Sequence, residues 1–181
     1  MGHRRWEVTP GFCILWAFLI LTLPPGFLAA AVFAALVHEA FHAGAVRLWG
    51  GRILGMTLGA GGMVMEVTAM DPGRELVCAL AGPAGSLLLT FLPAPTAALC
   101  GLCQGLFNLL PLMPLDGGRA LGCILEMTAP RHRSWIQQVA EMAVLTLLLA
   151  AAWRLGTGGI LVWAALALRK FPCKPWGKRV Q

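Results

Sequence analysis

The sequence has few charged residues for its length. Its 181 residues include 14 Lys and Arg and 8 Asp and Glu, so that 12% are charged, whereas 58% are hydrophobic. Soluble domains are about 25% charged and roughly 45–50% apolar. A chain of this size could not bury so much apolar surface in one soluble core. The composition therefore excludes a soluble protein and a disordered one, and it predicts a polytopic membrane protein that is embedded in a lipid bilayer.

The features of nucleic-acid-binding and disulfide-rich proteins are also missing. The net charge is +6, but the basic residues lie at the edges of apolar segments and not along one helix face, so we expect no nucleic-acid partner. The six cysteines fall mostly in apolar stretches, and we interpret them as packing residues. No signal-peptide cleavage site is evident, so the first apolar segment is expected to remain in the protein.

Six apolar segments predict membrane-spanning helices, because a helix needs roughly 20 apolar residues to cross the hydrocarbon core. The segments cover residues 8–23, 26–48, 75–92, 95–115, 134–153 and 157–168. We therefore expect an all-α polytopic fold with about six transmembrane helices. Residues 1–181 would form a single membrane-embedded domain.

The basic residues predict the orientation of these helices. With the N-terminus inside, every Lys and Arg except Arg154 falls in an inner loop or in the inner C-terminal tail. This distribution predicts a multi-pass protein with both termini in the cytoplasm.

Residues 50–70 have a different pattern. Two apolar runs flank Gly59–Gly62, and Met63, Met65 and Val67 alternate with Val64, Glu66 and Thr68. This pattern predicts a small β-hairpin at the inner face, between the second and third helices. Since an open sheet edge cannot face lipid, the hairpin must pack on protein or line a wet cavity.

The second predicted helix carries three ionisable residues within one turn. His38 and His42 are four residues apart and share one helix face, where both imidazoles can bind one zinc ion. Glu39 lies beside the first histidine and can accept a proton from an activated water. A pair of histidines that only hydrogen-bond within the bundle is the alternative. Ionisable groups inside a membrane helix are costly, which favours a functional role.

A catalytic zinc ion needs a third protein ligand. Most acidic residues lie at interfaces, in the hairpin or in the inner loops, and Asp116 remains as the candidate. It follows a stretch with two prolines and precedes Gly117 and Gly118, so the fourth helix is expected to break there. An Asp that only caps a helix end is the alternative. With this topology His42 and Asp116 both lie on the inner side of the bilayer, as a shared site requires.

These residues carry a resemblance to a known family. His38-Glu39-Ala40-Phe41-His42 in one membrane helix, followed by residues 108–118 (NLLPLMPLDGG) in a later one, resembles the site-2 protease family of intramembrane zinc metalloproteases. The intervening hairpin and residues 81–86 (AGPAGS) are similar to its compact branch, which includes a bacterial sporulation protease that processes pro-sigma-K.

The resemblance implies roles for individual residues. It implies that His38, His42 and Asp116 bind Zn²⁺, that Glu39 is the general base, and that Asn108 docks substrate or polarises its carbonyl. The expected function is regulated proteolysis of a membrane-associated protein near the cytoplasmic face of a bacterial cell membrane, with a transcription factor pro-sequence as one substrate class. A regulatory membrane protein is a further potential partner.

Two departures from the family pattern limit this expectation. Ser86 stands where the family often has Asn, and the sequence shows neither a CBS domain nor a PDZ insertion. Two other functions stay open on the sequence alone. One is a proteolytically inactive membrane-binding module, against which an intact Glu39 argues. The other is a metal transporter, which would need polar groups along a path and not at one depth.

Overall fold

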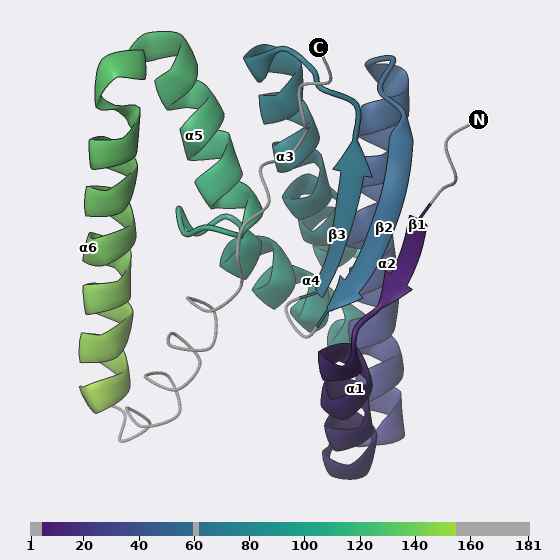
Figure 1. Cartoon of the computed structure of the whole chain (residues 1–181). Helices are drawn as coiled ribbons and strands as arrows, with labels where there is room; N and C mark the ends of the chain where they lie inside the picture. Colours follow the sequence, from purple (N-terminus) through teal and green to yellow (C-terminus); the bar gives the residue numbers. More distant parts are fainter. Residues whose placement is uncertain (1–4, 60–61, 155–181) are drawn as a thin grey trace.

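The computed structural model describes residues 5–59 and 62–154 (Figure 1). The fold is mostly helical and includes a small three-stranded sheet. Three helical segments are long and apolar enough to cross a membrane, at Pro25–Leu48, Pro72–Phe91 and Pro130–Arg154. The helical class is therefore confirmed, whereas six crossings remain a prediction. The expected helix at residues 157–168 lies outside the described residues.

The elements follow one another with short connections. In chain order they are β1 (Arg5–Val8), α1 (Pro10–Thr22), α2 (Pro25–Leu48), β2 (Ile53–Gly59), β3 (Gly62–Val67), α3 (Pro72–Leu88), α4 (Pro95–Asn108), α5 (Asp116–Thr128) and α6 (Arg133–Arg154). Helices α1 to α4 each begin at a proline. The first helical position suits proline, because the N–H that proline lacks would have no partner inside the helix.

The predicted hairpin is present, and the structure adds a third strand to it. β2 and β3 pair antiparallel, with Met56 opposite Met65. β1 pairs with β2 in parallel, so that the strand order is β1-β2-β3. β1 was not predicted from the sequence, because an alternation of four residues beside an apolar helix is too short to identify a strand. β2 is therefore the central strand, and β3 is an edge strand.

The sheet packs on the helices through one face of β3. Met65 and Val67 are buried against Ala45 and Val46 of α2 and Cys78 of α3. In Figure 1 the sheet lies in front of α2, with β3 as the strand nearest to α3. The alternation seen in the sequence thus separates a buried face of β3 from an exposed face, as period-two patterning requires.

The expected fourth helix is wrong in its last third. α4 ends at Asn108, residues 109–115 are irregular, and a separate helix α5 begins at Asp116. The sequence analysis assigned residues beyond 115 to an inner loop, because Gly117 and Gly118 suggested a break. Gly117 and Gly118 instead lie in the first turn of α5. A side chain there would collide with the irregular segment, since a Cβ on Gly117 would lie 2.1 Å from the backbone oxygen of Leu109.

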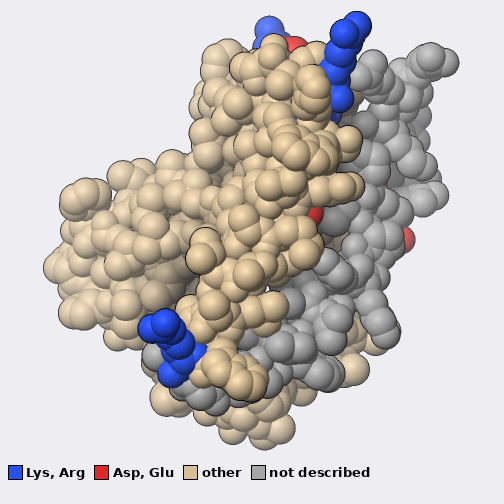
Figure 2. All heavy atoms as spheres, turned by 90° about the vertical axis from the view of Figure 1, so that its left-hand side faces the viewer, with Lys and Arg blue, Asp and Glu red and all other residues tan. Residues whose placement is uncertain are grey.

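The basic side chains of α6 lie at its two ends. Figure 2 views the face that carries α6, and the Lys and Arg side chains of the described residues appear at the two ends of this face, with a mostly apolar surface between them. Arg133 and Arg154 are the first and last residues of α6. This arrangement is typical of a helix that spans a bilayer.

Helices α2 and α3 approach closely because α3 has glycine at the contact. A Cβ on Gly85 would lie 2.4 Å from the ring of Phe41 on α2, whereas a Cβ on Gly44 would meet nothing within 4 Å. We expect Gly85→Ala to lower the free energy of unfolding by about 1–3 kcal/mol through overpacking. Gly44→Ala is the matched control on α2. Thermal unfolding of both variants in detergent checks this, and equal midpoints would contradict the contact.

Candidate metal centre

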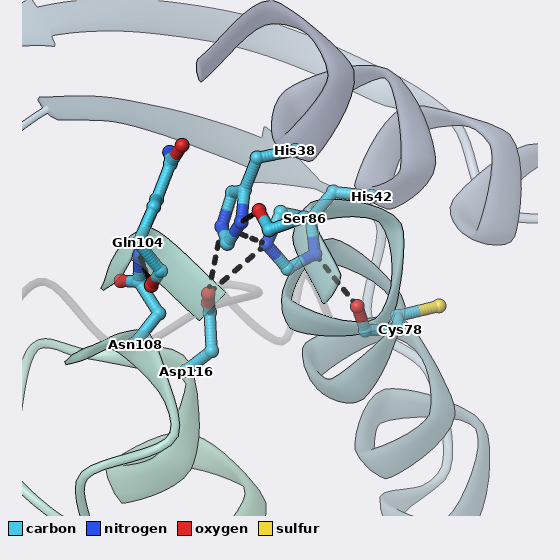
Figure 3. A network of polar contacts seen from close by, with 7 residues as sticks. All are labelled: His38, His42, Cys78, Ser86, Gln104, Asn108 and Asp116. Carbon is cyan, nitrogen blue, oxygen red and sulfur yellow. Dashed lines mark hydrogen bonds and ion pairs between the residues drawn. The ribbon is translucent and has the colours of Figure 1, made fainter. Parts of the chain in front are cut away.

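Three buried side chains from two distant segments meet in the interior. His38 and His42 come from α2 and Asp116 from the first position of α5, and their exposed fractions are 3%, 6% and 7%. Asp116 Oδ2 lies 3.0 Å from His38 Nε2 and 3.1 Å from His42 Nε2. The two Nε2 atoms are 3.1 Å apart. Figure 3 shows all three side chains pointing toward one another. The residues proposed from the sequence as metal ligands therefore converge at one point.

The other ring nitrogen of each histidine is held by α3. His42 Nδ1 donates to the backbone carbonyl oxygen of Cys78 at 2.7 Å, and His38 Nδ1 lies 2.8 Å from the hydroxyl of Ser86 (Figure 3). Ser86 is fully buried. Metal-binding histidines usually donate their free N–H to a carbonyl or another polar group, which fixes the ring orientation. Both rings therefore present Nε2 toward Asp116.

This geometry has an electrostatic consequence. A carbonyl oxygen only accepts, so His42 carries its proton on Nδ1 and, when neutral, has a lone pair on Nε2. The Ser86 hydroxyl can donate or accept, so it is compatible with either tautomer of His38. The two Nε2 atoms and the carboxylate oxygen repel one another at such distances wherever no proton or cation lies between them. Burial favours the neutral acid, but hydrogen bonds from protonated Nε2 atoms of both histidines outweigh it and lower the pKa of Asp116 to about 2. Asp116 is therefore ionised at neutral pH.

The donor set fits a metal ion. Within the described residues, His38, His42 and Asp116 form a group whose ligand atoms lie within 4.8 Å of one another. Two imidazoles and one carboxylate are the ligand types of catalytic zinc sites, which keep one position open. Ligand atoms about 2.0–2.1 Å from a tetrahedral ion are separated by about 3.3 Å, close to the distances seen here.

Glycines make room for the ligands. A Cβ on Gly82 of α3 would lie 2.1 Å from His42 Nε2, and a Cβ on Gly118 would lie 2.5 Å from the backbone of Leu112. Because Gly82 has no side chain, the His42 ring fits beside α3. Because Gly118 has none, the first turn of α5 fits next to the site. The AGPAGS segment therefore serves the site as well as helix packing.

The other site residues proposed from the sequence, Glu39 and Asn108, are not among the three side chains that converge. Glu39 interacts electrostatically with His38, His42 and Asp116, but no hydrogen bond to them is present. Asn108 is at the end of α4 and donates from Nδ2 to the backbone oxygen of Gln104 at 3.1 Å. No contact joins Asn108 to the three ligand candidates among the described residues. Glu66, the acidic residue of the hairpin, is exposed on β3 and is not in the group.

Two contributions to the site were not predicted. In the sequence Ser86 stood out only as a departure from the family pattern, yet its hydroxyl lies 2.8 Å from His38 Nδ1. A serine among glycines on an apolar helix could have indicated a buried polar partner for a histidine. The Cys78 carbonyl had no signal in the sequence, because any residue supplies one. Gln104, one turn before Asn108 and drawn beside it in Figure 3, is a further polar residue on α4.

The geometry defines a mostly helical protein with three helical segments long and apolar enough to cross a membrane and a buried His-His-Asp group that could hold a metal ion. The comparisons with known proteins agree with this description. Residues 91–151 match the family described as Peptidase family M50; this segment contains Asp116 and Asn108 but not the α2 histidines. The site-2 protease from Methanocaldococcus jannaschii has the same fold, with a TM-score of 0.65 and 22% identity, over 89% of this chain and 85% of that one.

A curated relative agrees with both matches. The Synechocystis sp. protein sll0528, whose name assigns it provisionally as a zinc metalloprotease, is 34% identical over 54% of this chain. The chain spans only 31% of the length of that relative. Together these matches confirm the resemblance of this chain to the site-2 protease family and support a membrane zinc metalloprotease.

Gly82 allows a sharp test of the centre that leaves every ligand in place. Gly82→Ala puts a methyl group where the His42 ring lies, so we expect it to weaken metal binding by at least the roughly 10–100-fold that loss of an orienting contact to a ligand typically costs. Gly26→Ala is the control, since its Cβ would meet nothing within 4 Å. Metal content after dialysis against a weak chelator measures the effect. Full metal retention in Gly82→Ala would contradict the His42 position.

Proposed function

We propose that this chain is an intramembrane zinc endopeptidase that cleaves a membrane-associated protein. The observation that carries the proposal is the convergence of His38 Nε2, His42 Nε2 and Asp116 Oδ2, with the Nδ1 atom of each histidine held by α3. The fold match and the M50 match support the same class. In this proposal His38, His42 and Asp116 bind the zinc ion.

Glu39 is the proposed general base. A bound zinc ion would supply Lewis-acid activation of water and of the scissile carbonyl. Glu39 then accepts the proton of the attacking water and passes it to the amide nitrogen as the peptide bond breaks. Its position next to His38, within electrostatic range of all three ligand candidates, suits this role. Asn108 is the proposed contact for the substrate backbone.

The proposed orientation places the site toward the cytoplasm. Arg47, Arg52 and Arg74 flank the connections between α2, the hairpin and α3, and Arg154 ends α6. Under the positive-inside rule, the α2–α3 side is cytoplasmic in a bacterial cell membrane. We therefore infer cleavage near the cytoplasmic boundary, with release of a product to the cytoplasm. A transcription factor pro-sequence is the substrate class that the sporulation branch suggests.

The free edge of β3 is the proposed holder of an extended substrate. The Leu58 carbonyl accepts from Thr9 N–H at 2.9 Å, so the backbone groups of Leu58 point toward β1. Leu58 is opposite Met63, which is therefore in a non-hydrogen-bonded pair, and its N–H and C=O point away from β2. Met65, two residues on, has the same orientation. An unwound substrate segment can pair with these groups as an added strand.

Two variants separate catalysis from metal binding. We expect Glu39→Gln to keep zinc and to lose roughly 10²–10⁴-fold in cleavage rate, because the amide cannot accept the proton. We expect Asp116→Ala to lose zinc and activity together, since two histidines leave the ion under-coordinated. Zinc content and cleavage of a membrane peptide, measured on the same preparations, check both. Turnover by Glu39→Gln near the wild-type rate would refute the mechanism, and stoichiometric zinc in Asp116→Ala would refute the ligand set.

The β3 edge has its own test. Met63→Pro removes an outward N–H and leaves the pairing with β2 intact, so we expect cleavage to fall roughly 5–10-fold, the value of one hydrogen bond of about 1 kcal/mol. Met63→Ala is the control, because it removes the side chain and keeps the N–H. Cleavage assays of a membrane substrate, with the cut mapped by mass spectrometry, distinguish them. Equal rates for the two variants would eliminate strand pairing and leave the metal chemistry untouched.

A further inference from the structure

The segment that carries Asp116 is irregular and tightly folded. Residues 109–115 join α4 to α5, and two short turns hold them: Leu112 N donates to Leu110 O at 2.7 Å, and Leu115 N donates to Leu112 O at 2.8 Å. Gly117 and Gly118 press the first turn of α5 against this segment. A displacement of the segment would therefore move Asp116 with it.

Helix α6 contacts the backbone on both sides of Asp116, once in residues 109–115 and once in the first turn of α5. Glu141 Oε1 accepts from the backbone N–H of Met113 at 3.3 Å, three residues before Asp116. Gln137 Nε2 donates to the backbone oxygen of Gly118 at 3.2 Å, two residues after Asp116. Gln137 Nε2 also lies 3.5 Å from Glu141 Oε1, so that the two side chains form one polar pair.

These contacts are notable because few residues of α6 are buried against the other described elements. Ala152 is the only buried residue of α6 among those described, and in Figure 1 the helix stands at one side of the molecule and lies beside α5. Near the first turn of α6, Arg133 pairs with Glu126 of α5. A carboxylate and an amide within an apolar span are costly, and such groups usually mark a functional position.

We propose that Gln137 and Glu141 are positioning residues that hold Asp116 in the metal centre, so that the docking of α6 completes the site. The proposal rests on the metal centre of the proposed function. The pair acts through the backbone of Met113 and Gly118 and touches neither the metal ligands nor a substrate. Outer contacts of this kind typically change metal affinity by about 10–100-fold.

The chain offers matched variants for a test. Glu141→Leu removes the acceptor for Met113 N–H, whereas Glu141→Gln keeps an acceptor oxygen and rescues the contact. Gln137→Leu removes the donor to Gly118 and leaves Glu141 in place. Gln138→Leu is the control: Gln138 is the exposed neighbour on α6, and the described residues include no hydrogen-bond partner for it.

The experiment titrates the full chain in detergent with Co²⁺ against a chelator and records the visible absorption spectrum of the bound ion. We expect affinity to fall about 10–100-fold in Glu141→Leu and several-fold in Gln137→Leu, with a changed spectrum as one ligand loosens, and to stay within about threefold in Glu141→Gln and Gln138→Leu. A role in stability alone would shift the unfolding midpoint and leave the spectrum of the folded protein unchanged.

Each result decides the question. Wild-type affinity and spectrum in Glu141→Leu would overturn the proposal, and so would an equal loss in Glu141→Gln, because the hydrogen bond would then be irrelevant. If Glu141→Leu fails to fold, Gln137→Leu decides, and an unchanged spectrum there overturns the proposal. Failure of the wild-type chain to bind Co²⁺ would instead refute the metal centre, which keeps the two proposals separable.

Discussion

The structure depends on the meeting of two imidazole nitrogens and one carboxylate oxygen in an apolar interior. These atoms repel one another without a cation or a proton, so the surrounding chain must hold them in place. α3 supplies a carbonyl and a hydroxyl that hold the Nδ1 atoms of the two rings, and glycines on α3 and α5 let backbones and rings approach within contact distance. Much of the helix packing follows from the need to support this one charged cluster.

The sequence predicted the parts of the site that depend on local spacing. His38 and His42 share a helix face because an α-helix repeats every 3.6 residues, and an acidic residue in a broken membrane helix is rare enough to identify Asp116. The hairpin was also predictable, because two apolar runs flank a glycine-containing turn and Met63, Met65 and Val67 occupy alternate positions of the second run.

The remaining features depend on contacts that local patterns do not encode. Gly117 and Gly118 indicated a helix end, but their role is to fit the first turn of α5 against residues 109–115. β1 forms because it pairs with the edge of β2. A segment of four residues would not be a stable strand alone. Ser86 and Cys78 hold the histidines through packing of α3 on α2, which spacing along one helix cannot show.

The N-terminal strand has a consequence for how the sheet can grow. A bare hairpin has two open edges, and an incoming chain could join either of them. Here β1 occupies the outer edge of β2, and Thr9 adds both its N–H and its hydroxyl to the Leu58 carbonyl. The sheet is thereby left with a single growing side, on the strand nearest to α3 (Figure 1). The short strand β1 thus blocks one edge of the hairpin, so that a further strand can add only along β3.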